Sequence, residues 1–392
     1  MAHFLGLLAG VALIALILVD AFETIIQPRR VTRRLRLTRV FFFASWAAWT
    51  GLARRLSSEA EWERSTRRDR RLGVYGPLAL LLLLALWAAG LVLGFGLIQW
   101  GLGSALHVTG TRGFGTDLYL SGTTFFTLGL GDVVPTGGWA RAATVAECAT
   151  GFSFLALIIG YLPTIYSAFS AREAEIILLD ARAGSPPTAL GLLERFGPDP
   201  RGEQVDAFLL DWERWTAHLL ESQLSYPVLT FFRSQHERQS WLSALTMILD
   251  ACSLVLVGIE TPDGPLPRRQ ARLTFAVGRH AVGDLCQVTN AVPHFDGTDR
   301  LPPEDVTELR ARLSQAGLRL REGPEADRLL AELRALYEPY AAAIAERLRF
   351  VLPPWLPPEG EVDDWTTTAW ETDPAASLRA VDPACRSANA AQ

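Results

Sequence analysis

Three long apolar runs limit what this chain can fold into. They cover residues 4–26, 77–98 and 142–162, and a helix of that length crosses roughly 30 Å of hydrocarbon. A fourth run, residues 40–53, is shorter and has Arg on both sides. It fits a helix lying at the membrane surface, with Trp46 and Trp49 at the level of the headgroups. We therefore expect three membrane spans and an all-α fold.

Charge is divided unevenly along the chain and predicts the orientation of the spans. The 392 residues carry a net charge of −5, and all 37 basic residues are Arg. Residues 1–72 hold 13 Arg against 6 acidic residues, a net charge of +7, and every one of those Arg lies within residues 28–72. By the positive-inside rule, residues 28–72 and the C-terminal half are cytoplasmic, and the N-terminus lies outside a cell membrane. We expect residues 29–71 to meet anionic lipid headgroups and the acidic C-terminal half, and not nucleic acid.

Two acidic residues, Asp20 and Glu23, stand at the cytoplasmic end of the first run. Ionisable groups at membrane depth are candidates for a functional role. The alternative, which we favour, is that both reach the interface and pair with Arg29, Arg30 or Arg33.

A glycine motif separates the second and third runs. The chain reads Ser-Gly-Thr-Thr-Phe-Phe-Thr-Leu-Gly-Leu-Gly-Asp from Ser121 to Asp132. This resembles the T-x-G-x-G-D pore signature of the potassium channel family, and the resemblance covers roughly residues 75–172. Leu128 and Leu130 occupy the positions at which Val and Tyr are commonest, so one hydroxyl that would anchor the loop is missing.

The resemblance implies a cage of oxygens for a dehydrated K⁺ ion. Backbone carbonyls from four chains supply such a cage, and Gly129 and Gly131 can adopt positive φ at little steric cost. Asp132 caps the outer mouth, where it either attracts cations or pins the loop. The ion-binding residues implied are Thr127 (with its hydroxyl), Leu128, Gly129, Leu130, Gly131 and Asp132. Permeant K⁺ is the one ion expected; no cofactor or resident metal is implied.

A pore helix is expected directly before the filter, at residues 117–126, with Thr116 as its N-cap. Thr123 and Thr124 either brace the filter by hydrogen bonds or simply pack the helix. One filter motif per chain implies a homotetramer. No span carries an Arg ladder, which excludes a six-span voltage-gated channel.

Small residues in the third run suggest how the pore opens. Gly151 lies 22 residues after Gly129, where inner helices of the family often carry a hinge glycine. Gly160 and Pro163 offer a second bend, because Pro163 removes a backbone hydrogen bond. Glycine also serves helix packing in membranes, so hinge and packing remain alternatives.

The sequence of the C-terminal half predicts a soluble helical bundle. Residues 241–257 are apolar but contain Asp250, Ser and Thr, which fits a buried helix better than a fourth span. No GxGxxG and no nucleophile–base motif occurs, so neither nucleotide sensing nor an enzyme is expected. The predicted domains are a first transmembrane helix at 1–27, an Arg-rich cytoplasmic segment with an interfacial helix at 28–73, a pore domain at 74–172, a linker at 173–200, a cytoplasmic helical domain at 201–352 and an extended tail at 353–392.

Two groups in this half could hold a metal or another cytoplasmic ligand. One is His280 with Asp284, and the other is His294 with Asp296 and Asp299. Solvated surface residues are the commoner interpretation of both. Four widely spaced Cys predict free thiols and no disulfide framework.

Together these observations favour a tetrameric potassium-selective channel gated by inner-helix motion and its cytoplasmic domain. One alternative is a channel weakly selective among monovalent cations. Another is a membrane-anchored sensor or binding protein with a vestigial pore.

Overall fold

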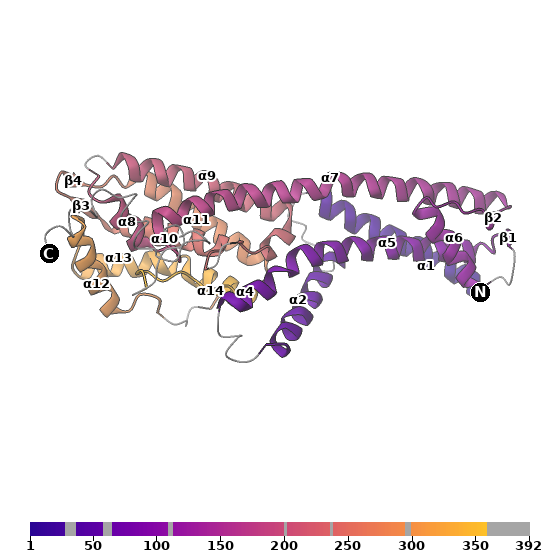
Figure 1. The fold of residues 1–392 in the computed structure, drawn as a ribbon, viewed down its shortest axis with the longest axis horizontal. Coiled ribbons are helices and arrows are strands. Elements are labelled where there is room, and N and C mark those ends of the chain that lie inside the picture. The colour runs from indigo at the N-terminus through magenta and orange to yellow at the C-terminus, as the bar shows by residue number, and fades with distance from the viewer. Residues whose placement is uncertain are drawn as a thin grey trace, which may run out of the picture. The chain divides into compact units, whose positions relative to one another are not determined.

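A computed structural model describes residues 1–27, 37–57, 65–108, 113–199, 202–235, 238–294 and 299–358 (Figure 1). Helices dominate, which confirms the all-α prediction, although these described residues also form five short strands that were not foreseen. The chain divides into two compact units. Unit 1 comprises Met1–Leu56, Val74–Ala168 and Leu224–Leu229, and unit 2 comprises Ser57–Gly73, Phe169–Gln223 and the chain from Thr230 onward.

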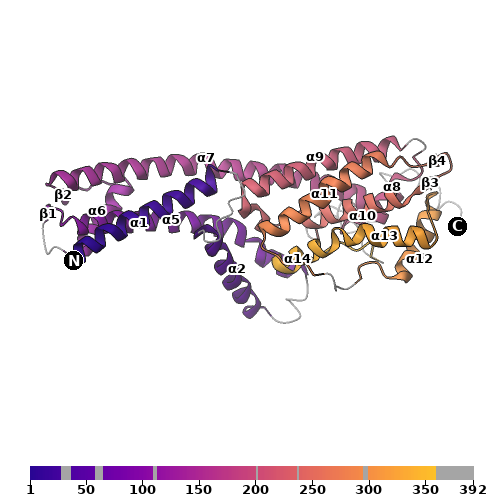
Figure 2. The ribbon, with the colours of Figure 1, turned by 180° about the vertical axis from the view of Figure 1, so that it is seen from behind.

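Unit 1 holds the apolar helices. Its elements are α1 (Ala2–Ile25), α2 (Leu37–Arg55), α5 (Tyr75–Gly101), β1 (Leu106–Val108), α6 (Phe114–Phe125), β2 (Val133–Pro135) and the greater part of α7 (Gly138–Ala183). Among the described helices, three are long and apolar enough to cross a membrane: α1, the stretch that ends with α5, and α7. The N-terminus lies beside β1, β2 and α6 in both views (Figure 2), where His3 contacts the carbonyl oxygen of Trp100 at 2.8 Å.

Glycines bring α1 and α5 close together. A Cβ on Gly10 would lie 2.6 Å from the carbonyl oxygen of Gly94, and a Cβ on Gly94 would lie 2.6 Å from the side chain of Ile14. Small residues at such a crossing let two membrane helices pack backbone to backbone. Helix α1 is therefore held along the length of α5.

Asp20 joins three helices at the far end of α1. Its carboxylate is 3% exposed and accepts hydrogen bonds from the backbone N–H of Thr38 (3.2 Å), the Thr38 hydroxyl (2.5 Å) and Trp87 Nε1 (3.0 Å). Hydroxyl, amide and indole donors therefore bind the Asp20 carboxylate, and its pairing with Arg stays a prediction. The proposed partners Arg29, Arg30 and Arg33 lie outside the described residues.

Unit 2 is a helical bundle around α10. Its elements are α4 (Ser65–Gly73), the end of α7, α8 (Ala189–Phe196), most of α9 (Glu203–Ser225), the end of the 3₁₀ helix η1 (Pro227–Phe231), α10 (Trp241–Val257), α11 (Arg269–Val288), α12 (Pro303–Gln315), α13 (Pro324–Ala335) and α14 (Glu338–Leu348). A small antiparallel sheet has the order β4 (Gly264–Pro265), β3 (Ile259–Thr261), β5 (Arg319–Leu320). α10 packs against α8, α11, α13 and α14, so its apolar residues form the centre of the core.

The expected linker at residues 173–200 is instead helical. α7 continues to Ala183, and α8 follows after a short loop. Leu179, Leu190 and Leu193 are each 1% exposed or less and belong to the core of unit 2. The Gly and Pro residues at 184–187 and 197–198 lie just before and just after α8. The expected tail also starts too early, because Trp355 is 1% exposed within the same core.

The Arg-rich helix α4 belongs to unit 2 and is fixed there by its one acidic residue. Asp69 accepts a hydrogen bond from Arg233, whose guanidinium also lies 4.5 Å from the Phe350 ring centroid. Burial lowers the pKa of Arg233 to about 10, so it remains charged at neutral pH. We expected acidic residues of the C-terminal half to pair with Arg of residues 29–71. In this contact the Arg belongs to the C-terminal half, and the carboxylate belongs to the Arg-rich helix α4.

One segment of the C-terminal half belongs to unit 1. Within Leu224–Leu229, the ring of Tyr226 packs edge-on against Tyr161 of α7, with centroids 5.8 Å apart. Tyr161 is 6% exposed and directly follows Gly160. Unit 1 is therefore assembled from three separate stretches of chain.

Candidate ion-conduction site

The short helix α6 sets up the site. It begins at Phe114, and Gly113, not Thr116, occupies the N-cap position in extended backbone. The carbonyl of Gly113 accepts a hydrogen bond from the N–H of Thr116 at 2.9 Å, which draws Thr116 into the first helical turn. The predicted Thr116 cap is wrong because the helix starts three residues earlier, and it ends at Phe125, one residue before the predicted end.

The backbone of the glycine motif alternates in handedness. Thr127, Gly129 and Gly131 have φ values of +57°, +56° and +80°, whereas Leu128 and Leu130 are not among the residues with positive φ. Residues that alternate between the left-handed and the extended or right-handed regions turn their successive carbonyls toward one side. Positive φ was expected at the two glycines. Thr127 shares it, although this conformation is strained for a β-branched residue.

The C-terminal turn of α6 holds the start of this loop by backbone hydrogen bonds. The N–H of Leu128 donates to the carbonyl of Thr123 at 2.8 Å, and the N–H of Thr127 donates to the carbonyl of Thr124 at 3.0 Å. The Thr123 hydroxyl instead donates within the helix, to the Leu120 carbonyl at 3.0 Å. Thr123 and Thr124 therefore hold the loop through their backbone carbonyls, while the Thr123 hydroxyl bonds within the helix.

The end of the loop is held by a strand pair and a tyrosine. β2 pairs antiparallel with β1, with Val133 opposite Val108 and Pro135 opposite Leu106. Asp132 lies between Gly131 and β2, beside the hydroxyl of Tyr119 on α6. This hydroxyl supplies an anchor between the helix and the outer end of the loop, which Leu130 cannot make.

The side chains of the loop have few neighbours within one chain. Leu128 is 62% exposed and Leu130 is 64% exposed, although both are apolar. Neighbouring apolar side chains with this much exposed surface usually pack against another protein surface. Further chains around the loop would provide that packing.

Helix α7 lies directly behind α6 at Gly151. A Cβ on Gly151 would lie only 2.2 Å from the carbonyl oxygen of Phe125, and the Phe154 ring contacts the Phe125 ring at 5.9 Å. Gly160, in contrast, has no atom within 4 Å of an added Cβ. Pro163 sits inside the same continuous helix. The contacts assign Gly151 a packing role, while bending at Gly160 or Pro163 stays a prediction.

Two residues near the site had escaped the sequence analysis. Glu147 of α7 is fully buried and contacts the hydroxyl of Ser121 on α6. A carboxylate inside an apolar membrane run is the signal that could have identified it. Tyr119 gave no comparable signal, because nothing in its sequence position points to Asp132.

Neither of the two proposed metal groups gathers three ligands among the described residues. Within the described part of the chain, no group of three or more His, Cys, Asp or Glu could hold a metal ion. His280 lies 3.4 Å from Asp284. His294 pairs with Glu346 at 2.9 Å, and this hydrogen bond holds the pKa of Glu346 below its ordinary value. Asp299 pairs with Arg334 instead, and Asp296 lies outside the described residues.

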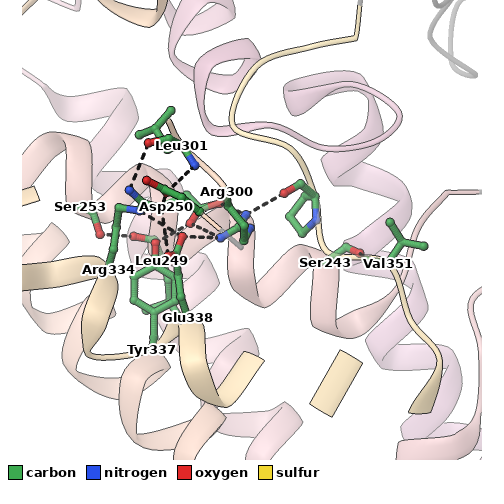
Figure 3. Close-up of polar contacts among 12 residues, drawn as sticks. Ser243, Leu249, Asp250, Ser253, Arg300, Leu301, Arg334, Tyr337, Glu338 and Val351 are labelled. Carbon is green, nitrogen blue, oxygen red and sulfur yellow. Dashed lines mark hydrogen bonds and ion pairs between the residues drawn. The ribbon is translucent and has the colours of Figure 1, made fainter. Parts of the chain in front are cut away.

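A polar cluster in unit 2 explains the carboxylate in α10. Arg300 donates to both oxygens of the fully buried Asp250, at 2.8 and 3.2 Å, and to Glu338 at 2.9 Å (Figure 3). The Tyr337 hydroxyl donates to Asp250 at 2.5 Å. Burial alone would lower the pKa of Arg300, but Asp250, Tyr337 and Glu338 together outweigh burial and raise it. Every charge in the cluster has a partner inside the bundle, so its role is to hold α10, α14 and the segment before α12 together.

Comparison with known proteins picks out the same part of the chain. Residues 81–167 match a family described as "Ion channel". The match runs from α5 through α6 and the glycine motif into α7, and it leaves out α1, α2 and all of unit 2. A curated relative, the uncharacterized membrane protein YdjJ of Bacillus subtilis (strain 168), is 23% identical over 245 residues, which are 61% of this chain and 69% of that protein. No solved structure matches this chain. These findings support an ion channel in a membrane.

Proposed function

We propose that the protein is a potassium-selective channel that conducts K⁺ through the loop Thr127–Leu128–Gly129–Leu130–Gly131–Asp132. The observation that carries this proposal is the alternating backbone of Thr127, Gly129 and Gly131. Carbonyls turned to one side provide the oxygens that replace the water around a dehydrated cation. Asp132, fixed by Tyr119, places a carboxyl group at the outer end of the row.

Four chains complete the cage. Each chain carries one glycine motif, and the exposed Leu128 and Leu130 side chains lack packing within it. A homotetramer with closed symmetry gives every ion fourfold coordination and covers these side chains. The filter end of unit 1 then faces outward together with the N-terminus, and unit 2 is cytoplasmic. Arg54 and Arg55, exposed at the end of α2, meet anionic lipid headgroups.

The place of the Tyr119 hydroxyl beside Asp132 supports potassium over weak selectivity in this proposal. The weakly selective alternative rested on Leu130, which cannot anchor the loop by a hydroxyl. Tyr119 supplies a hydroxyl to Asp132, which lies two positions after Leu130 in the loop. A rigid loop keeps its carbonyls at the spacing that suits one ion.

Flux through purified protein in liposomes tests the proposal. K⁺ flux with Na⁺ excluded supports it, flux of both ions supports the weakly selective alternative, and no flux supports the vestigial pore. A tetramer in detergent, measured by light scattering, tests the assembly.

A matched pair of variants tests the loop backbone itself. A Cβ on Gly129 or on Gly115 meets no atom within 4 Å, but Gly129 has φ +56° and Gly115 lies in α6 without positive φ. Gly129→Ala should therefore abolish K⁺ flux through backbone strain alone. Gly115→Ala should conduct as the unaltered chain does; equal flux in both variants would contradict the role of the alternating backbone.

A further inference from the structure

The carboxyl group of Glu147 is enclosed in the membrane unit. Its side chain, in α7, belongs to a residue with 0% exposure. One oxygen, Oε1, contacts the hydroxyl of Ser121, and Oε2 makes no hydrogen bond within the described chain. An ionised carboxylate with a single hydrogen bond is very costly in such surroundings.

The hydroxyl of Ser121 has two oxygen neighbours. It lies 2.6 Å from the carbonyl oxygen of Val92 in α5, and it also contacts Glu147 Oε1 in α7. A serine hydroxyl carries one proton, and a backbone carbonyl oxygen carries none. With an ionised Glu147, one of the two contacts would bring lone pairs together without a proton between them.

We propose that Glu147 is protonated and that its O–H donates to Ser121, whose own O–H donates to the carbonyl of Val92. This arrangement places one proton in each contact. It forms a chain of two hydrogen bonds across α7, α6 and α5. Glu147 is thus a positioning residue: it touches no ion, and it fixes the pore helix between the two membrane helices that flank it.

The link to conduction runs along α6 and rests on the proposed channel function. Ser121 lies two residues before Thr123, whose carbonyl accepts the N–H of Leu128 at 2.8 Å. One turn further along α7, Gly151 packs against the carbonyl of Phe125. Helix α7 therefore contacts the pore helix α6 at two successive turns. The contact of Glu147 with Ser121 is polar, and the contact of Gly151 with Phe125 is steric. Ser121 and Phe125 both lie on α6, which leads into the filter.

Infrared spectroscopy reads the proton without depending on conduction. Full-length protein in liposomes is compared with Glu147→Gln and Glu147→Met, and the spectra are subtracted. We expect the C=O stretching band of a protonated carboxylic acid in the unaltered chain and its loss in both variants. If the subtraction reveals no such band, Glu147 is ionised and the proposal is wrong. Two variants are used so that one that fails to fold leaves the measurement possible.

Ion flux tests the positioning role. Glu147→Gln keeps an N–H that can donate to Ser121, so its K⁺/Na⁺ flux ratio should match that of the unaltered chain. Glu147→Met and Ser121→Ala each remove a proton from the chain of hydrogen bonds, and we expect the ratio to fall about tenfold, the size of one buried hydrogen bond. An unchanged ratio in both would overturn the role. A lack of K⁺ flux in the unaltered chain would refute the channel function and leave the infrared result standing.

Discussion

Gly151 should tolerate no larger side chain. The Cβ of Gly151→Ala would lie 2.2 Å from the carbonyl oxygen of Phe125, 3.0 Å from its carbonyl carbon and 3.1 Å from its Cα. All three are backbone atoms, so no side chain can rotate away. Restoring a separation of 3.0 Å to the oxygen requires a shift of about 0.8 Å. Overpacking of this kind costs about 1–3 kcal/mol.

The shift falls on the end of α6 that holds the filter. Thr123 and Thr124, whose carbonyls accept the N–H groups of Leu128 and Thr127, directly precede Phe125. We expect Gly151→Ala to lower the midpoint of thermal unfolding and to reduce the K⁺/Na⁺ flux ratio in liposomes. Both effects follow from one displaced contact.

Gly160→Ala is the matched control in the same helix. An added Cβ there meets no atom within 4 Å, and Ala favours a helix over Gly by roughly 1 kcal/mol. Its flux ratio should stay unchanged, with equal or higher stability. If Gly151 were only a hinge, both glycines would affect the rate of opening and neither would affect selectivity. A Gly151→Ala protein with unaltered unfolding and unaltered flux ratio would refute the packing argument.

Three further predictions concern other parts of the chain. Asp250→Ala should lower the free energy of unfolding by about 3–5 kcal/mol in chemical denaturation, because it removes one of the two carboxylates paired with the buried Arg300 guanidinium and also the acceptor of the Tyr337 hydroxyl. Asp211→Ala, which breaks an ion pair with both side chains at least 66% exposed, should change it by less than about 1 kcal/mol, and equal losses would contradict this. Burial raises the pKa of the Cys252 thiol, so the reactive thiolate should be scarce at neutral and mildly alkaline pH, and maleimide labelling of Cys252 should wait for denaturant; labelling that accelerates with mild alkali would refute it. Tyr119→Phe removes the hydroxyl that bonds Asp132 and should lower the K⁺/Na⁺ flux ratio, whereas an unchanged ratio would show that this anchor is not needed.

The membrane part of the fold was predictable because hydrocarbon imposes a strict length and composition on a helix. The three spans and the glycine loop follow from apolar runs and from the spacing of Gly129 and Gly131. The start of α6 was not predictable in this way. Gly113 has no side chain that could mark it as an N-cap. Thr116 is the residue type preferred at an N-cap, but the chain already enters the helix at Phe114.

Unit 2 was harder to predict, since its boundaries depend on tertiary packing. Leu190 and Leu193 resemble a short apolar patch in a loop until α10 and α12 supply a surface to cover it. The positive φ of Thr127 and the role of Glu147 were missed for a related reason. A strained φ and a shared hydroxyl proton arise from geometry among several elements, and neither leaves a pattern in neighbouring residues.

The placement of Leu224–Leu229 in unit 1 means that the pore cannot be isolated by shortening the chain. A protein ending after α7 would lose Tyr226 and uncover the ring of Tyr161, one residue from Gly160. A chimaera that joins residues 1–183 to a foreign cytoplasmic domain would carry the same defect. Exchange of domains between such proteins should therefore follow the folded units, with residues 224–229 kept alongside the membrane helices and not with the bundle that surrounds them in the sequence.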